Sequence, residues 1–141
     1  MKKKYINNYL NLFSNLNKEN IKKFDDLVVK DIIFIDPFNN IKGANSFKKI
    51  FNHMFENLKD PKFLILDYSI NNQRVFLKWK MTFFAFKSLQ IIEGMSELIL
   101  NDDGKISTHI DYWDSLNGIF IKIPFIGFIY KISLFMFKAK T

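Results

Sequence analysis

Three residues of types that transfer protons stand out in this chain: Asp36, His109 and Asp111. A carboxylate accepts a proton from a bound molecule, and an imidazole can donate or accept one near neutral pH. His109, Asp111 and Trp113 occupy alternate positions, so in a strand their side chains would share one face. Burial raises the pKa of a carboxyl group and a neighbouring imidazolium lowers it. Two carboxyl groups beside an imidazole in an apolar cavity could therefore differ in pKa, so that one group acts as an acid and another as a base.

Other kinds of chemistry find little support in the residue types. The chain has no cysteine, which excludes disulfides and thiol catalysis. No nucleophile-elbow motif is present, which disfavours covalent acyl transfer. The second histidine, His53, belongs to a different segment, and none accompanies His109 at the spacing of metal ligands. We therefore expect neither a metal nor a cofactor.

The segment that carries His109 and Asp111 indicates a β-hairpin. Residues 91–114 form two strand-like runs joined by Asp103-Gly104, a pair typical of tight hairpin turns. Short linkers separate this hairpin from earlier strand-like runs, which favours an antiparallel meander. The four expected strands are Phe63 to Ile70, Arg74 to Phe84, Leu89 to Leu100, and Lys105 to Asp114. An earlier strand, residues 32–36, ends at Asp36-Pro37 because proline forces its predecessor to be extended.

Helical periodicity precedes the sheet. Apolar residues recur at helical spacing from Ile6 to Leu16 and again from Ile21 to Val28. A third helix is predicted from the Asn45-Ser46 pair to Leu58, with an apolar stripe, and Pro61 is expected to close it. Helices followed by a sheet that must be covered on one face indicate an α+β fold.

Charge decides which side of the strand from Arg74 faces inward. One face would carry Arg74, Lys78, Lys80 and Thr82, and the other Val75, Leu77, Trp79, Met81 and Phe83. The apolar set must point to the core. A strongly bent sheet around helices would leave this concave aromatic face partly unfilled near its mouth, where ligand pockets occur.

Several motifs resemble those of a known family. Residues 36–39 read DPFN, residues 93–98 EGMSEL, residues 103–106 DGKI and residues 109–114 HIDYWD. Together with the order of elements, these stretches resemble the nuclear transport factor 2-like fold, and within it the SnoaL-like bacterial proteins. The resemblance covers nearly the whole chain. It implies a cone-shaped α+β barrel, with N-terminal helices packed on a strongly bent mixed or antiparallel sheet and an extra C-terminal helix. We expect a single domain over residues 1–141, with a core cone of residues 1–114 and an apolar helical tail of residues 115–141.

The ketosteroid isomerases share this fold, and the resemblance carries their site onto particular residues. By this resemblance, their general base corresponds to Asp36 and their second pocket acid to Ser96. Their pocket tyrosine aligns near Phe13, one helical turn from Tyr9. Because phenylalanine cannot donate a hydrogen bond, the match argues against a steroid isomerase. We take Asp36, His109 and Asp111 as the candidate catalytic residues. The candidate pocket residues are Tyr9, Phe13, Phe38, Ile50, Met54, Trp79, Met81, Phe83, Ser96 and Trp113.

Each candidate also has a purely structural interpretation. Asp36 could end its strand and accept hydrogen bonds within the turn of residues 36–40. His109 and Asp111 could be an inert pair that holds the sheet mouth. The fold hosts cyclases, isomerases, hydrolases and binders. We therefore carry two hypotheses: acid–base catalysis of isomerase, cyclase or hydratase type on a hydrophobic polyketide-, terpenoid- or lipid-like ligand, and non-catalytic binding, transport or dimerisation.

Composition bears on partners and location. The net charge is +7 and the pI near 9.5, but the lysines are dispersed and no nucleic-acid-binding motif is present. We expect no nucleic-acid partner. The apolar run near the start of the chain is broken by asparagines and no small-residue cleavage site follows, so a cytoplasmic protein is expected. The resemblance implies a homodimer formed through the outer sheet face.

The tail from Ile119 to Phe137 is apolar nearly all round a helical wheel, so it must be buried or in contact with lipid. Lysines, Pro124 and Gly127 interrupt a stretch barely long enough to span a membrane. Pro124 should divide it into a short piece and a terminal helix. Two roles stay open: a lid over the pocket, or an interfacial anchor whose Lys122, Lys131, Lys138 and Lys140 meet anionic headgroups.

Overall fold

The computed structural model describes residues 2–133 of the chain. Within these residues it has five α-helices, two short 3₁₀ helices and six strands. In chain order they are α1 (Lys2–Ser14), η1 (Ile21–Lys23), α2 (Phe24–Leu27), β1 (Val28–Ile35), β2 (Asn40–Lys42), α3 (Ala44–Asn57), β3 (Lys59–Asn71), β4 (Arg74–Ala85), β5 (Ser88–Leu100), β6 (Ile106–Trp113), α4 (Ser115–Gly118), η2 (Phe120–Lys122) and α5 (Pro124–Ser133).

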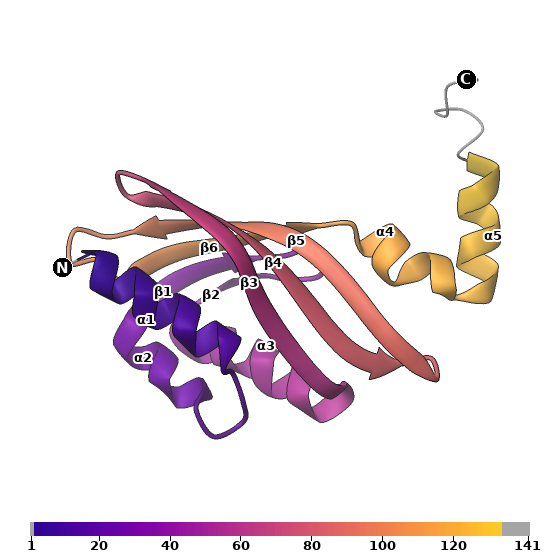
Figure 1. Cartoon of the computed structure of the whole chain (residues 1–141), viewed down its shortest axis with the longest axis horizontal. Helices are drawn as coiled ribbons and strands as arrows, with labels where there is room; N and C mark the ends of the chain where they lie inside the picture. Colours follow the sequence, from indigo (N-terminus) through magenta and orange to yellow (C-terminus); the bar gives the residue numbers. More distant parts are fainter. Residues whose placement is uncertain (1, 134–141) are drawn as a thin grey trace.

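The strands form one open, strongly bent sheet in the order β2-β1-β6-β5-β4-β3 (Figure 1). Strands β3 to β6 make the predicted antiparallel meander. Strand β1 pairs with β6 in parallel and with β2 in antiparallel fashion, so the sheet is mixed. The expected cone-like α+β fold is thereby confirmed, with a sheet that curves without closing.

Helices α1, α2 and α3 cover the concave face of the sheet (Figure 1). Between helices and sheet lies a core of aromatic rings, in which Phe24, Phe47 and Phe51 pack with ring centroids 5.0 to 5.3 Å apart. The inward set predicted for β4 is buried, whereas Arg74 and Lys78 are exposed on the outer face. Charge alternation thus assigned the two faces of β4 correctly.

Three boundaries differ from the sequence predictions. Pro61 does not close the third helix, which ends at Asn57; it lies buried inside β3. The strand tolerates proline there because β3 is an edge strand and its register shifts between Lys59 and Lys62, a bulge at which Asp60 has φ of 53°. Val28 begins β1 instead of ending a helix, and the three-residue strand β2 has too little pattern to be predicted.

The tail leaves the sheet through Asp114, whose carboxylate caps α4 by accepting hydrogen bonds from the main-chain nitrogens of Leu116 (3.1 Å) and Asn117 (3.0 Å). The side-chain amide of Asn117 also donates to this carboxylate. That bond contributes most, followed by the main-chain bonds, to lowering the pKa of Asp114. Pro124 begins α5, which confirms the predicted division, and α5 stands away from the sheet (Figure 1). Residues 134–141, which complete the predicted tail helix, lie outside the described residues. Among the described helices, none combines the length and apolar character needed to cross a membrane.

Candidate functional site

Strand register gathers the polar candidates on the concave face. Ser96 of β5 lies directly opposite Asp111 of β6, and the next inward residue of β6, His109, lies opposite Leu98. On β4, Trp79 lies opposite Gly94 of β5. Residues opposite each other in antiparallel strands project to the same face, so three strands direct their side chains at one place.

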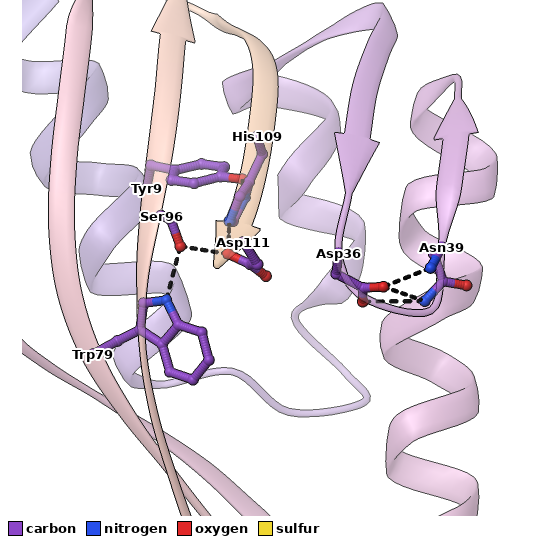
Figure 2. A network of polar contacts seen from close by, with 7 residues as sticks. All are labelled: Tyr9, Asp36, Asn39, Trp79, Ser96, His109 and Asp111. Carbon is purple, nitrogen blue, oxygen red and sulfur yellow. Dashed lines mark hydrogen bonds and ion pairs between the residues drawn. The ribbon is translucent and has the colours of Figure 1, made fainter. Parts of the chain in front are cut away.

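These side chains form a continuous chain of hydrogen bonds (Figure 2). The indole Nε1 of Trp79 donates to Ser96 Oγ at 2.8 Å, and Ser96 in turn donates to Asp111 Oδ1. His109 Nε2 lies 2.7 Å from the same Asp111 oxygen. At the far end, the hydroxyl of Tyr9 on α1 lies 2.8 Å from His109 Nδ1.

The partners of His109 indicate its tautomer. The carboxylate of Asp111 can only accept, so in the neutral ring the hydrogen of His109 lies on Nε2, and Nδ1 accepts from the Tyr9 hydroxyl. Burial, and secondarily the negative charge of Asp111, raise the pKa of Tyr9 well above its usual value, so its hydroxyl keeps the hydrogen that it donates. Both ring nitrogens are then satisfied. His109 is only 3% exposed and is enclosed by aromatic rings, so it lies behind Asp111 as seen from the cavity.

The two oxygens of Asp111 differ in their surroundings. Oδ1 receives hydrogen bonds from both Ser96 and His109. Within residues 2–133, no protein donor bonds to Oδ2, which is turned toward the side of Asp36 (Figure 2). The Asp111 side chain is 19% exposed. The carboxylate is therefore held by one oxygen and open to a bound molecule at the other.

A cavity of about 280 Å³ lies between α3 and the concave face. Its lining is mostly aromatic and aliphatic, with Asp111 among the few polar groups. Of the predicted pocket residues it contains Phe38, Ile50, Met54, Trp79, Met81, Phe83 and Trp113, together with Asp36 and Asp111. A neighbouring space of about 30 Å³ is lined by Tyr9, Phe13, Ser96 and His109 and shares Trp79 and Asp111 with the larger one. All the candidate residues thus line one space or the other, on either side of Asp111.

Asp36 lines the cavity from the turn after β1, where its carboxylate is occupied. Its Oδ1 accepts a hydrogen bond from the main-chain nitrogen of Phe38 (2.7 Å). It also accepts from the main-chain nitrogen (2.6 Å) and the side chain (3.0 Å) of Asn39 (Figure 2). This is the turn-forming arrangement that the sequence offered as the structural role of Asp36. Asn39, which completes it, stands within the DPFN motif and could have been identified from that pattern.

Gly94 allows the indole of Trp79 to lie across β5. A Cβ atom at position 94 would stand 2.5 Å from Cζ2 of Trp79 and 2.9 Å from Cβ of Trp113. Any larger residue would push Trp79 away from Ser96. The glycine thus leaves room for its neighbours.

Sequence reasoning missed part of the cavity wall. Ile92 has the same strand parity as Ser96 and lines the cavity, so parity alone could have placed it there. Phe63 also lines it, but it opens an unbroken apolar run, residues 63–66, and alternation cannot decide which of these residues face inward. His53 lines the cavity from α3, where its ring is exposed. Among the described residues, no cluster of three or more histidine, aspartate or glutamate side chains is placed to hold a metal ion.

Comparison with known sequences and structures agrees with this architecture. A family profile described as the SnoaL-like domain matches residues 9–109. A comparison with curated proteins found no match. Among solved structures, a nuclear transport factor 2-like protein of unknown function from Exiguobacterium sp. 255-15 is 19% identical, with a TM-score of 0.67 over 78% of this chain and 98% of that one.

Two further structures have named activities. A putative SnoaL-like polyketide cyclase from Jannaschia sp. CCS1 is 12% identical, with a TM-score of 0.70 over 80% of this chain and 87% of that one. An LEH-like epoxide hydrolase from M. tuberculosis is 16% identical, with a TM-score of 0.66 over 82% of this chain and 84% of that one. At such low identities the likeness shows a shared fold alone.

Proposed function

Because the chain belongs to the SnoaL-like domain family, we propose that its cavity binds a hydrophobic small molecule and that Asp111 transfers a proton on that molecule. One observation carries the proposal: Asp111 presents an unoccupied carboxylate oxygen to an apolar cavity, while its other oxygen is held by Ser96 and His109. A general base needs this combination of fixed orientation and a free acceptor.

The proposed step needs no co-reactant. Oδ2 of Asp111 takes a proton from a carbon or hydroxyl of the ligand, the electrons shift within the ligand, and the carboxylic acid returns the proton at a second position. Atoms and electrons balance within the ligand, as in an isomerisation or ring closure. A hydration would add water as co-reactant: the water gives one proton to Oδ2, its hydroxide adds to the ligand, and the carboxylic acid then returns that proton to the ligand atom that gained the electron pair.

The remaining polar residues act through Asp111. His109 and Ser96 fix the carboxylate by donating to Oδ1, and Tyr9 and Trp79 fix those two donors. We therefore assign them positioning roles. Asp36 shapes the rim of the cavity through its turn.

The cavity limits the ligand class. A volume of about 280 Å³ with an aromatic wall suits an apolar molecule of modest size carrying one reactive polar group. Polyketide-, terpenoid- and lipid-like molecules meet this description. Solved structures of this fold include one named a putative polyketide cyclase and one named an epoxide hydrolase, and these names support the proposal.

Proton exchange tests the proposal. Native mass spectrometry of the purified chain identifies small molecules that co-purify with it, and incubation of such a molecule with the protein in deuterated water reports proton transfer as a mass increase. The wild-type chain should catalyse exchange and Asp111→Asn should not, although it still binds. Binding without exchange by the wild-type chain would instead support a carrier.

The tryptophans give a second readout for binding. Trp79 and Trp113 are the only two in the chain, and both line the cavity. Energy transfer from them to anilinonaphthalene sulfonate should report occupancy of the cavity without knowledge of the natural ligand. Displacement of this dye by a candidate molecule then measures its affinity.

We also propose a homodimer through the outer sheet face. That face exposes apolar side chains on β4, β5 and β6, among them Phe76 (38%), Met95 (51%) and Tyr112 (57%). Met95 and Tyr112 lie opposite each other in the sheet, which makes the patch continuous. A monomeric mass from light scattering at micromolar concentration would contradict the dimer.

A further inference from the structure

Helix α5 presents an apolar face to solvent. Phe125, Phe128, Ile129 and Ile132 follow the i, i+3, i+4, i+7 spacing of one helix face and are 75%, 64%, 53% and 60% exposed. Single exposed apolar residues are ordinary, but four in one stripe on a short helix mark a contact surface.

The opposite side of α5 is fixed to the preceding 3₁₀ helix, η2. Gly127 is buried there, and a Cβ atom at its position would stand 2.4 Å from the carbonyl oxygen of Ile121. This close approach turns the apolar stripe outward, away from η2. Among the described elements, α5 also stands away from the sheet, so the sheet does not cover the stripe (Figure 1).

The charge of the tail indicates which kind of surface the apolar stripe contacts. Residues 115–141 contain no aspartate or glutamate but four lysines. Lys131 lies at the edge of the apolar stripe, Lys122 of η2 donates to Gln90 Oε1, and Lys138 and Lys140 lie outside the described residues. Aromatic residues beside lysines suit the interface of an anionic bilayer, where the rings enter the acyl region and the ammonium groups meet the headgroups. Two copies of this tail would repel each other because both are cationic. The ten residues of α5 are also too few to span a bilayer.

We propose that α5 docks this chain on the surface of an anionic membrane, with Phe125 and Phe128 as its main anchors. The docking is peripheral and reversible, since one short apolar stripe and a few lysines give weak binding. Its strength depends on ionic strength because the lysine contribution is screened by salt.

Docking would also bring the cavity to the lipid. Ile119, between α4 and η2, lines the cavity, and the ring of Phe120 lies 5.9 Å from that of Phe38 at the rim. The tail and the cavity mouth therefore share a boundary. If the proposed function holds, a lipid-dissolved ligand could pass from the bilayer into the cavity; this step alone rests on that function.

Flotation with vesicles tests the docking itself. The full chain is mixed at low salt with vesicles of phosphatidylcholine containing phosphatidylglycerol, or of phosphatidylcholine alone. We expect flotation with the anionic vesicles and its loss at high salt. Phe125→Ser/Phe128→Ser should lower the partition coefficient at least about tenfold, since each buried phenylalanine contributes 1.5 kcal/mol or more. The matched control, Phe84→Ser/Phe86→Ser, alters two phenylalanines that are 46% and 57% exposed in β4 and the turn after it, and should float like the wild-type chain.

Two results would overturn the docking. One is a full chain that stays in the soluble fraction with anionic vesicles at low salt. The other is a Phe125→Ser/Phe128→Ser variant that floats as well as wild type. If the wild type does not float and the variant has a smaller mass by light scattering, the stripe binds a second copy instead. Dye binding without vesicles should be the same in wild type and tail variant, so failure of the cavity proposal can be told apart from failure of docking.

Discussion

His109 contacts Asp111 through Nε2 and Oδ1 at 2.7 Å, and this contact gives the two carboxylate oxygens different roles. Oδ1 is tied to the interior by His109 and Ser96, whereas Oδ2 is left for the cavity. A histidine beside an aspartate is often taken as a proton relay. Here the ring has no free nitrogen, because Tyr9 occupies Nδ1. The geometry therefore favours a base that is held by a histidine over a histidine that is activated by a carboxylate.

Asp111→Asn tests this assignment directly. The amide can keep its oxygen at the Oδ1 position and so retain the contacts with Ser96 and His109, but it cannot accept a proton. We expect exchange or turnover to fall by about 100-fold or more, the usual contribution of a general base, with ligand affinity nearly unchanged. Isotope exchange and dye displacement on the same preparation measure the two quantities. Unchanged exchange would remove Asp111 as the base.

Substitutions at Asp36 should separate structure from chemistry. Asp36→Asn keeps an acceptor for the main-chain nitrogens of Phe38 and Asn39, so stability and exchange should stay close to wild type. Asp36→Ala leaves both donors unsatisfied by the side chain, and we expect a loss of about 1 kcal/mol in the free energy of unfolding, measured by urea denaturation. If Asp36→Asn abolished exchange while Asp111→Asn did not, the base would be Asp36.

Gly94→Ala should disturb the site through Trp79. The added methyl group would overlap the indole, which stands 2.5 Å from the new Cβ position, so the ring must move and lose its bond to Ser96. We expect a change in tryptophan fluorescence, weaker dye binding and a destabilisation of about 1–3 kcal/mol. Lys49→Ala, an exposed position on α3 outside both the cavity lining and the proposed dimer face, is the control and should change stability by no more than about 0.5 kcal/mol. Equal effects of the two substitutions would argue against the close approach.

Much of this arrangement could be predicted from local patterns. The alternation of charged and apolar residues assigned the faces of β4, and Asp103-Gly104 located the hairpin that carries His109 and Asp111. Both signals arise from neighbouring residues, which is why a single sequence contains them. The parallel pairing of β1 with β6 has no such signal, because residues 28–35 could pair equally well with any strand. The family resemblance left both a mixed and an antiparallel sheet open.

The distribution of hydrogen bonds within the site could not be predicted. Tyr9 and His109 are 100 positions apart, and nothing near either residue indicates that their side chains meet. The resemblance placed the pocket hydroxyl near Phe13, one helical turn away from the residue that supplies it. Which oxygen of Asp111 remains free depends on small displacements of the strands and on the side-chain rotamers. Similarly, Pro61 was expected to end a helix. The bulge that accommodates it inside β3 depends on the pairing of β3 with β4, which no local pattern indicates.

The buried tyrosine leads to a prediction for stability at neutral pH. Tyr9→Phe leaves His109 Nδ1 buried without its donor, at a cost of about 1–3 kcal/mol in the free energy of unfolding. Urea denaturation at neutral pH measures it. Tyr68→Phe on β3 is the matched control, since Tyr68 is 39% exposed and its hydroxyl makes only a 3.4 Å contact with Asn7, and it should stay within about 0.5 kcal/mol of wild type.

The same tyrosine should also make stability depend on alkaline pH. Burial and the Asp111 charge raise the pKa of Tyr9 in the folded chain, whereas in the unfolded chain it titrates near the ordinary value of about 10. Below that pH both states keep the proton. Above it only the unfolded state releases it, so Tyr9 lowers the free energy of unfolding by up to about 1.4 kcal/mol per pH unit until the folded pKa is reached. Tyr9→Phe has no hydroxyl to ionise, and its stability deficit relative to wild type should therefore shrink as the pH rises above 10. A deficit that stayed constant across this range would mean that the Tyr9 hydroxyl ionises equally in both states, and the proposed donation to His109 would have to be abandoned.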